Sequence, residues 1–118
     1  MTVLDAIKLE RLGAQLSQQR DDLRREIEEY GADPDSDEVS FESDAGFSDR
    51  SHSTEERARV IAVVRALRSN LHDVDRALAK IAAGTYGTCE RCGDPIAEER
   101  LDAIPWALLC IDCKKLTA

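Results

Sequence analysis

The sequence predicts an all-α fold, in which an antiparallel two-helix coiled-coil hairpin precedes a small C-terminal four-cysteine module. Three features predict it: an unbroken heptad of aliphatic residues from Val60, a rougher helical stripe near the N-terminus, and two Cys-x2-Cys pairs near the C-terminus. With 4% aromatic and 34% charged residues, the 118-residue chain buries aliphatic seams more readily than a globular centre. We expect residues 1–83 to form the hairpin and residues 84–118 to form the module.

The first helix is predicted over residues of about 3–30. Its apolar residues follow a helical stripe that is interrupted at Gln19, where an apolar residue is expected. Gly31 and the Asp33-Pro34 pair end the helix, because glycine and proline do not continue it. The stripe consists of Leu9, Leu12, Leu16, Leu23, Ile27 and Tyr30.

A second helix is predicted over residues 54–83. Ser53 and Glu56 form a capping-box pattern at its start, and Gly84 marks its end. The first helix is net acidic and the second net basic, which favours pairing within one chain; a parallel dimer through the second helix is the alternative. The spacings of the second seam alternate between four and three, through Val60, Val64, Leu67, Leu71, Val74, Leu78 and Ile81.

The connection between the helices, residues 32–53, carries most of the chain's charge excess. Its seven acidic residues are opposed only by Arg50, giving −6 of the total −8. In an antiparallel hairpin this acidic loop forms the far tip, about 40 Å from the module at 1.5 Å per helical residue. With Phe41 and Phe47, its composition fits a solvated linker and, equally, a negative probe for a cation-lined cavity.

The four cysteines, Cys89, Cys92, Cys110 and Cys113, form two Cys-x2-Cys pairs separated by 17 residues. Such pairs bring four soft ligands onto one tetrahedral ion, and Gly93 suits the turn with positive φ that follows the first pair. Because no coordination position stays open for water, the sequence predicts one structural Zn²⁺ per chain. Iron in the same ligand set and a pair of disulfides are the alternatives.

Charge and motif content argue against several functions. An acidic chain without a concentrated basic face is a poor ligand for DNA or RNA, so we expect no direct nucleic-acid binding. We expect a cytoplasmic monomer, since the sequence has neither a signal-peptide pattern nor an apolar run that could cross a membrane. It also has no nucleophile–base pair, phosphate loop or open metal site, which argues against an enzyme.

Three segments near the C-terminus resemble the DksA/TraR four-cysteine zinc-finger family: residues 84–93 (GTYGTCERCG), 100–105 (RLDAIP) and 109–114 (LCIDCK). The resemblance covers residues 53–116, and a coiled-coil arm before the finger is also the architecture of the family. It implies a transcription regulator that binds RNA polymerase and inserts its coiled coil into the secondary channel. It further implies a tip near the catalytic magnesium and, as in several members, joint action with ppGpp.

The family's tip motif, Asp-x-x-Asp-x-Ala, is only partly present. Asp49 and Arg50 stand where the second aspartate and its arginine belong, whereas Gly46 and Ser51 replace the first aspartate and the alanine. Asp44, two residues before Gly46, is an alternative for the first aspartate. The resemblance implies that these five residues contact the partner, with Asp49 as the principal one.

At the rim of the channel, Arg91, Lys114 and Lys115 are candidates for polymerase contacts, although ordinary surface charge also accounts for them. Tyr86 and Trp106 are expected to pack around the finger, and His72 to face solvent. A zinc-finger and coiled-coil adaptor for a non-polymerase protein is the second function that the sequence allows. An adaptor would be indifferent to tip substitutions, and this separates the two.

Overall fold

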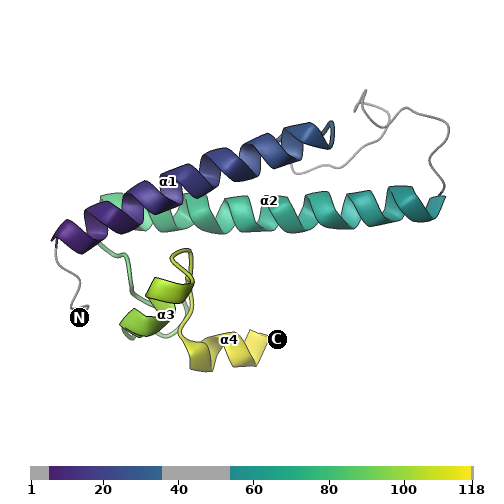
Figure 1. Cartoon of the computed structure of the whole chain (residues 1–118). Helices are drawn as coiled ribbons and strands as arrows, with labels where there is room; N and C mark the ends of the chain where they lie inside the picture. Colours follow the sequence, from purple (N-terminus) through teal and green to yellow (C-terminus); the bar gives the residue numbers. More distant parts are fainter. Residues whose placement is uncertain (1–5, 36–53, 118) are drawn as a thin grey trace. The chain divides into compact units, whose positions relative to one another are not determined.

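The computed structural model describes residues 6–35 and 54–117. This part contains the long helices α1 (Ala6–Glu29) and α2 (Thr54–Ala83) and the short helices α3 (Glu98–Ala103) and α4 (Ile111–Thr117) (Figure 1). It has no β-strand, although an isolated bridge joins Thr88 to Pro95. The all-α prediction is confirmed, and α2 has the predicted bounds. Within the described ranges no helix has the length and apolar character to span a bilayer.

The chain divides into two compact units. The first comprises Met1–Gln19 and Asp73–Ala118, and the second comprises Arg20–His72. Each unit pairs part of α1 with part of α2 in antiparallel directions (Figure 1). In the first unit, a Cβ added at Gly13 of α1 would lie 3.8 Å from Cδ1 of Ile81 of α2, an ordinary van der Waals contact between the two helices. The sequence-based boundary between hairpin and module stays a prediction.

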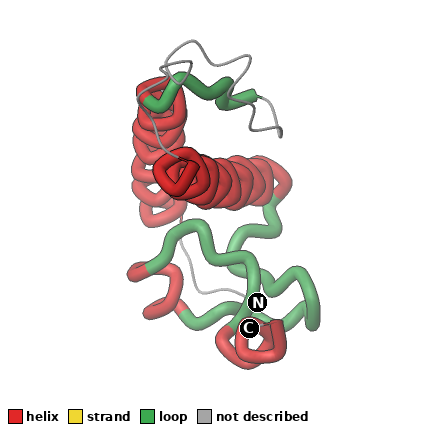
Figure 2. The backbone as a smooth tube through the Cα atoms, turned by 90° about the vertical axis from the view of Figure 1, so that its right-hand side faces the viewer, coloured by secondary structure: helices red, strands yellow, loops and turns green. Residues whose placement is uncertain are grey.

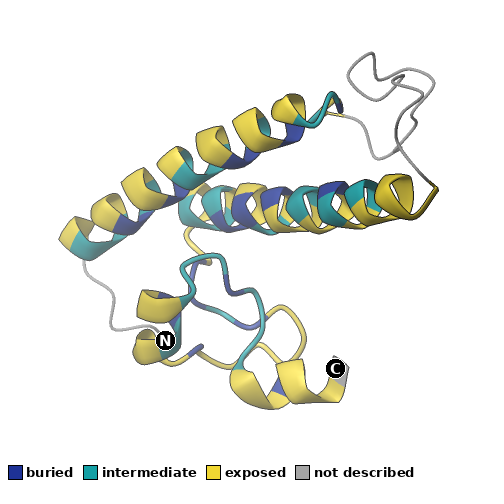
Figure 3. Ribbon diagram, turned by 45° about the vertical axis from the view of Figure 1, so that its right-hand side comes forward, coloured by how far each residue is buried: buried dark blue, intermediate teal, exposed yellow. Residues whose placement is uncertain are grey.

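The seam between α1 and α2 is the core of each unit. In the first unit Leu16 and Val74 are fully buried, and in the second Ile27 and Val64 are at most 1% exposed. Buried residues line the facing sides of the helices, while their outer sides are exposed (Figure 3). Full burial of one such side chain contributes about 1.5–3 kcal/mol. The predicted seam is confirmed at these positions, but Ala77, which lies outside it, is also fully buried.

Both long helices end in a Schellman motif. Gly84 follows α2 with φ 79°, and the amide of Thr85 donates to the Lys80 carbonyl at 2.9 Å. Gly31 has the same left-handed conformation after α1, with φ 82°. Because only glycine adopts this conformation without strain, the sequence predicted both helix ends correctly. At the other end of α2, Ser53 of the predicted capping box lies outside the described residues.

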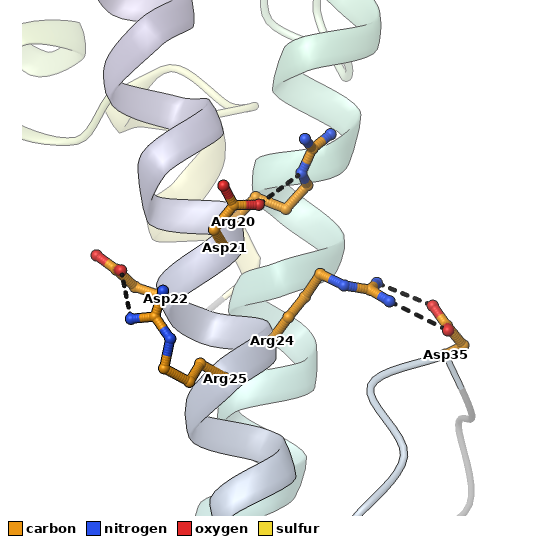
Figure 4. A network of polar contacts seen from close by, with 6 residues as sticks. All are labelled: Arg20, Asp21, Asp22, Arg24, Arg25 and Asp35. Carbon is orange, nitrogen blue, oxygen red and sulfur yellow. Dashed lines mark hydrogen bonds and ion pairs between the residues drawn. The ribbon is translucent and has the colours of Figure 1, made fainter.

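In the second unit, polar contacts hold the start of the acidic connection against both helices. Arg24 of α1 forms two hydrogen bonds with the Asp35 carboxylate, at 2.8 and 3.1 Å, and these lower the pKa of Asp35 (Figure 4). Arg68 of α2 donates to the Asp33 carbonyl at 2.6 Å. Such exposed pairs contribute little stability, but they direct the chain as it leaves α1. The connection from residue 36 to 53 lies outside the described residues.

Candidate metal centre

The first cysteine pair forms a tight knuckle. Gly93 closes it with φ 79° and donates its amide to the Cys89 carbonyl at 3.0 Å. The amides of Arg91 and Asp94 point at sulfur, with N···Sγ distances of 3.4 Å to Cys89 and 3.5 Å to Cys92. Donors aimed at sulfur stabilise the thiolate, which is the form that binds metal. The predicted positive φ at Gly93 is confirmed.

The second pair lies at the start of α4. This part of the first unit consists of loops and short helices (Figure 2). Cys110 precedes the helix and Cys113 lies in its first turn, where the Lys114 amide donates to the Cys110 carbonyl at 2.9 Å. The two pairs are joined by backbone, because the amide of Glu90 donates to the carbonyl of Leu108 at 2.9 Å. Cys113 is buried and Cys110 half-buried. Backbone hydrogen bonds within each pair and between the two pairs therefore position the four cysteines, and no large hydrophobic core is needed.

All four sulfur atoms converge on one point. They lie within 4.8 Å of one another, and the Sγ atoms of Cys92 and Cys110 are 3.8 Å apart. A tetrahedral zinc ion with Zn–S bonds of about 2.3 Å needs sulfur atoms about 3.8 Å apart, so this spacing fits zinc. All four cysteines are free, which disfavours the disulfide alternative. The four thiols are positioned to bind one metal ion, with none of the four tetrahedral positions left for water.

The thiols differ in acidity. Burial raises the pKa of Cys113 to about 12. At Cys89 burial also acts to raise the pKa, but backbone hydrogen bonds, largest first from Cys92, Cys110 and Arg91, outweigh it and lower the pKa to about 6. Metal binding must displace protons from the remaining thiols, so the metal affinity increases with pH.

Side chains of α2 fasten the first knuckle to the helix. Arg76 Nη2 lies 2.7 Å from Oε2 of Glu90, a residue that stands between Cys89 and Cys92 in the sequence. One turn further along, the Lys80 ammonium donates to the Thr88 carbonyl. Burial lowers the pKa of Lys80, although Glu90 and Cys89 act in the opposite direction. Ala77, which is buried outside the heptad seam, lies between Arg76 and Lys80 in the sequence.

An ion-pair cluster fastens α3 to the first turns of α1. Lys8 bonds to the Glu98 carboxylate and lies 2.9 Å from Oδ1 of Asp102. Hydrogen bonds to Glu98, followed by those to Asp102, raise the pKa of Lys8. Sequence reasoning missed this cluster because its partners are about 90 residues apart and follow no local pattern. The finger is thus held by both long helices of the first unit.

Tyr86 anchors the core of the finger. Its side chain is buried, as are those of Ile96 and Leu101, and its hydroxyl donates to the Pro105 carbonyl at 2.8 Å. Burial raises the pKa of Tyr86 to about 12. The prediction that Tyr86 packs here is confirmed. Trp106 is half-buried and lines a pocket of about 310 Å³ beside the finger.

Replacing Tyr86 with phenylalanine tests this anchor. The ring stays in place while the Pro105 carbonyl loses its donor, so the free energy of unfolding should fall by about 0.5–1.5 kcal/mol. Because the folded-state pKa is raised from 10.0 to about 12, the wild type should also lose stability as pH rises between these values. The variant should lack that loss. Urea unfolding at pH 8 and pH 11 measures both effects, and identical pH slopes would contradict them.

The remaining predicted site residues are not part of the set of four sulfur ligands. Arg91, Lys114 and Lys115 are exposed, and His72 is exposed on α2 as expected. Exposure allows Arg91, Lys114 and Lys115 to contact a partner but does not identify one, so their contact with RNA polymerase stays a prediction. The five predicted tip residues lie outside the described residues: Asp44, Gly46, Asp49, Arg50 and Ser51.

Comparison with known proteins concerns mainly the finger. Residues 84–116 match the family model of the prokaryotic dksA/traR C4-type zinc finger. General stress protein 16O of Bacillus subtilis is 45% identical over 47 residues, which cover 40% of this chain and 29% of that protein. The RNA polymerase-binding transcription factor DksA of Caulobacter vibrioides is 32% identical over 74 residues, covering 63% and 52%. The matched segments span at most about half the length of these relatives.

Two solved structures resemble the whole chain. Transcription factor DksA2 from Pseudomonas aeruginosa has a TM-score of 0.71 at 24% identity, covering 98% of this chain and 86% of that one, and so shares the fold. DnaK suppressor protein from Agrobacterium tumefaciens has a TM-score of 0.63 at 26% identity, covering 98% and 99%. The segment that holds the four clustered cysteines, residues 84–116, therefore matches the prokaryotic dksA/traR C4-type zinc finger, and the chain shares the fold of these two solved structures.

Proposed function

We propose that this protein is a transcription regulator that binds RNA polymerase and performs no catalysis of its own. The observation that carries the proposal is the finger fastened to both long helices by Arg76–Glu90 and by Lys8 with Glu98 and Asp102. A finger held in this way serves as a base for a helical arm. Relatives named as RNA polymerase-binding transcription factors support the choice of partner.

Zinc has a structural role in this proposal. Cys89, Cys92, Cys110 and Cys113 would hold one Zn²⁺, and the 3.8 Å spacing between two of their sulfur atoms supports that metal. The ion would supply cross-links between the two knuckles of a segment that has few buried residues. No reaction is assigned to it, because four thiolates leave no position for a substrate.

The arm is proposed to enter the secondary channel of the polymerase. An antiparallel helix pair suits a narrow pore, and the connection between its helices carries a net charge of −6 over residues 32–53. Such a charge favours a position near active-site cations. Asp49 is proposed as the principal tip residue, with Arg91, Lys114 and Lys115 at the rim. Joint action with ppGpp belongs to the same proposal.

Replacing Asp49 with asparagine should weaken the effect on transcription while leaving polymerase binding intact. The change removes one carboxylate from the tip, and a loss of about fivefold in the regulatory effect corresponds to about 1 kcal/mol. Transcription in vitro with purified polymerase measures the effect, and Asp37→Asn, an equal charge change in the same connection, is the control. If Asp49→Asn regulates as the wild type does, Asp49 has no part in the mechanism.

A non-polymerase adaptor is the alternative that the altered tip favours, since Gly46 and Ser51 replace two motif residues. Affinity capture from cell extract separates the two functions. We expect the core polymerase subunits to copurify with the tagged protein, and the amount of polymerase recovered to increase with the amount of tagged protein. Capture of a different protein without polymerase would support the adaptor and contradict the regulator.

A further inference from the structure

A basic groove follows one face of α2 in the second compact unit. It has a volume of about 350 Å³ and is lined by Arg65, Arg68, Ser69 and His72. These positions are spaced i, i+3, i+4 and i+7, so the helix places all four side chains on one face. Arg65, Ser69 and His72 are exposed, and Arg68 is half-buried. We call this surface the α2 groove.

The α2 groove lies in the most basic part of an acidic chain. Between Glu56 and Asp73 the helix has four arginines and no acidic residue, giving +4 where the whole chain has −8. The four are Arg57, Arg59, Arg65 and Arg68. In the part of the chain that the structure describes, Arg65 has no hydrogen-bond or ion-pair partner. This local excess of positive charge creates a positive electrostatic potential on this part of α2, although the chain as a whole is acidic.

We propose that the α2 groove docks an acidic protein surface of RNA polymerase, an inference that rests on the proposed function and names the contact face of the arm. The guanidinium fork of Arg65 pairs with carboxylates in two parallel hydrogen bonds. The Ser69 hydroxyl and the His72 imidazole add donors on the same face. Arg68, which holds the Asp33 carbonyl, ties this face to the start of the acidic connection.

An acidic protein fits the α2 groove better than a nucleic acid. Affinity for a phosphate backbone depends on neutralising many phosphates, and the net charge of −8 opposes that. A shallow, exposed helix face matches a protein surface, for which a few complementary charges set orientation and association rate. The contact should therefore depend strongly on ionic strength.

The test is the affinity of charge-reversal variants for purified core RNA polymerase. Arg65→Glu places an acid in the α2 groove, whereas Arg59→Glu makes the same charge change on the same helix, about 120° around its axis. Both residues are exposed. We expect Arg65→Glu to weaken binding about tenfold at low salt and Arg59→Glu less than about threefold, with the difference shrinking at high salt. Ser69→Glu should repeat the loss, and circular dichroism should show unchanged helix content.

The other outcomes overturn the proposal. If the wild type binds polymerase and the two arginine variants bind equally, the α2 groove is not the contact and the proposed function survives. If the wild type does not bind polymerase, both fail. A wild-type dimer in sedimentation that Arg65→Glu dissociates would assign the groove to a second copy. Loss of binding to duplex DNA, with polymerase binding unchanged, would assign it to nucleic acid.

Discussion

Replacing Cys113 with serine is expected to release the metal ion and unfold the finger. Cys113 is one of the two buried cysteines of the cluster, and serine is a poor zinc ligand at neutral pH. Structural zinc contributes about 10–16 kcal/mol in small modules, which exceeds the stability of many whole domains. Elemental analysis should find about one zinc per wild-type chain and none in the variant. Limited proteolysis should cleave the variant within residues 84–117.

Lys115→Ser is the matched control for this change. It introduces the same side chain into the same helix, but on an exposed position, so metal content and protease resistance should match the wild type. Full metal content in Cys113→Ser, together with wild-type protease resistance, would contradict a four-cysteine structural centre. Iron in place of zinc in the purified wild type would retain the centre and correct the metal.

Replacing Leu16 with alanine is expected to have the largest effect on the helix pair. Leu16 is fully buried on α1 in the first unit, where its loss removes apolar contacts and leaves a cavity. Such substitutions cost about 2–5 kcal/mol, a large part of the total stability of a small domain. Urea unfolding of the metal-loaded protein, followed by circular dichroism at 222 nm, measures the loss.

Ile7→Ala on the same helix is the control, because Ile7 is 75% exposed. Its removal should change the free energy of unfolding by less than about 0.5 kcal/mol. Equal losses in the two variants would mean that the α1–α2 seam does not carry the stability of the first unit.

The helix pair was predictable because its information is local. A heptad spacing such as that of Val64, Leu71 and Val74, which are seven and three residues apart, marks one face of a helix, and Gly31 and Gly84 mark where the helices end. The cysteine cluster was predictable for the same reason, since each Cys-x2-Cys pair is a single turn of backbone.

The attachment of the finger to the helices was not predictable. Lys8 and Glu98 are 90 residues apart, and Arg76 and Glu90 resemble ordinary surface charges until the chain folds. Ala77 is also fully buried although it lies off the heptad seam. A heptad pattern predicts which residues of two helices pack together, but it does not predict where the finger packs against them.

Competition for core RNA polymerase tests the central claim most directly. A labelled factor known to occupy the secondary channel is bound to the polymerase, and the purified metal-loaded protein is titrated against it. The proposed function predicts that the labelled factor is displaced fully and that Asp49→Asn displaces it equally well. Binding to polymerase without displacement would contradict the channel mode, and no binding at all would contradict the proposed partner.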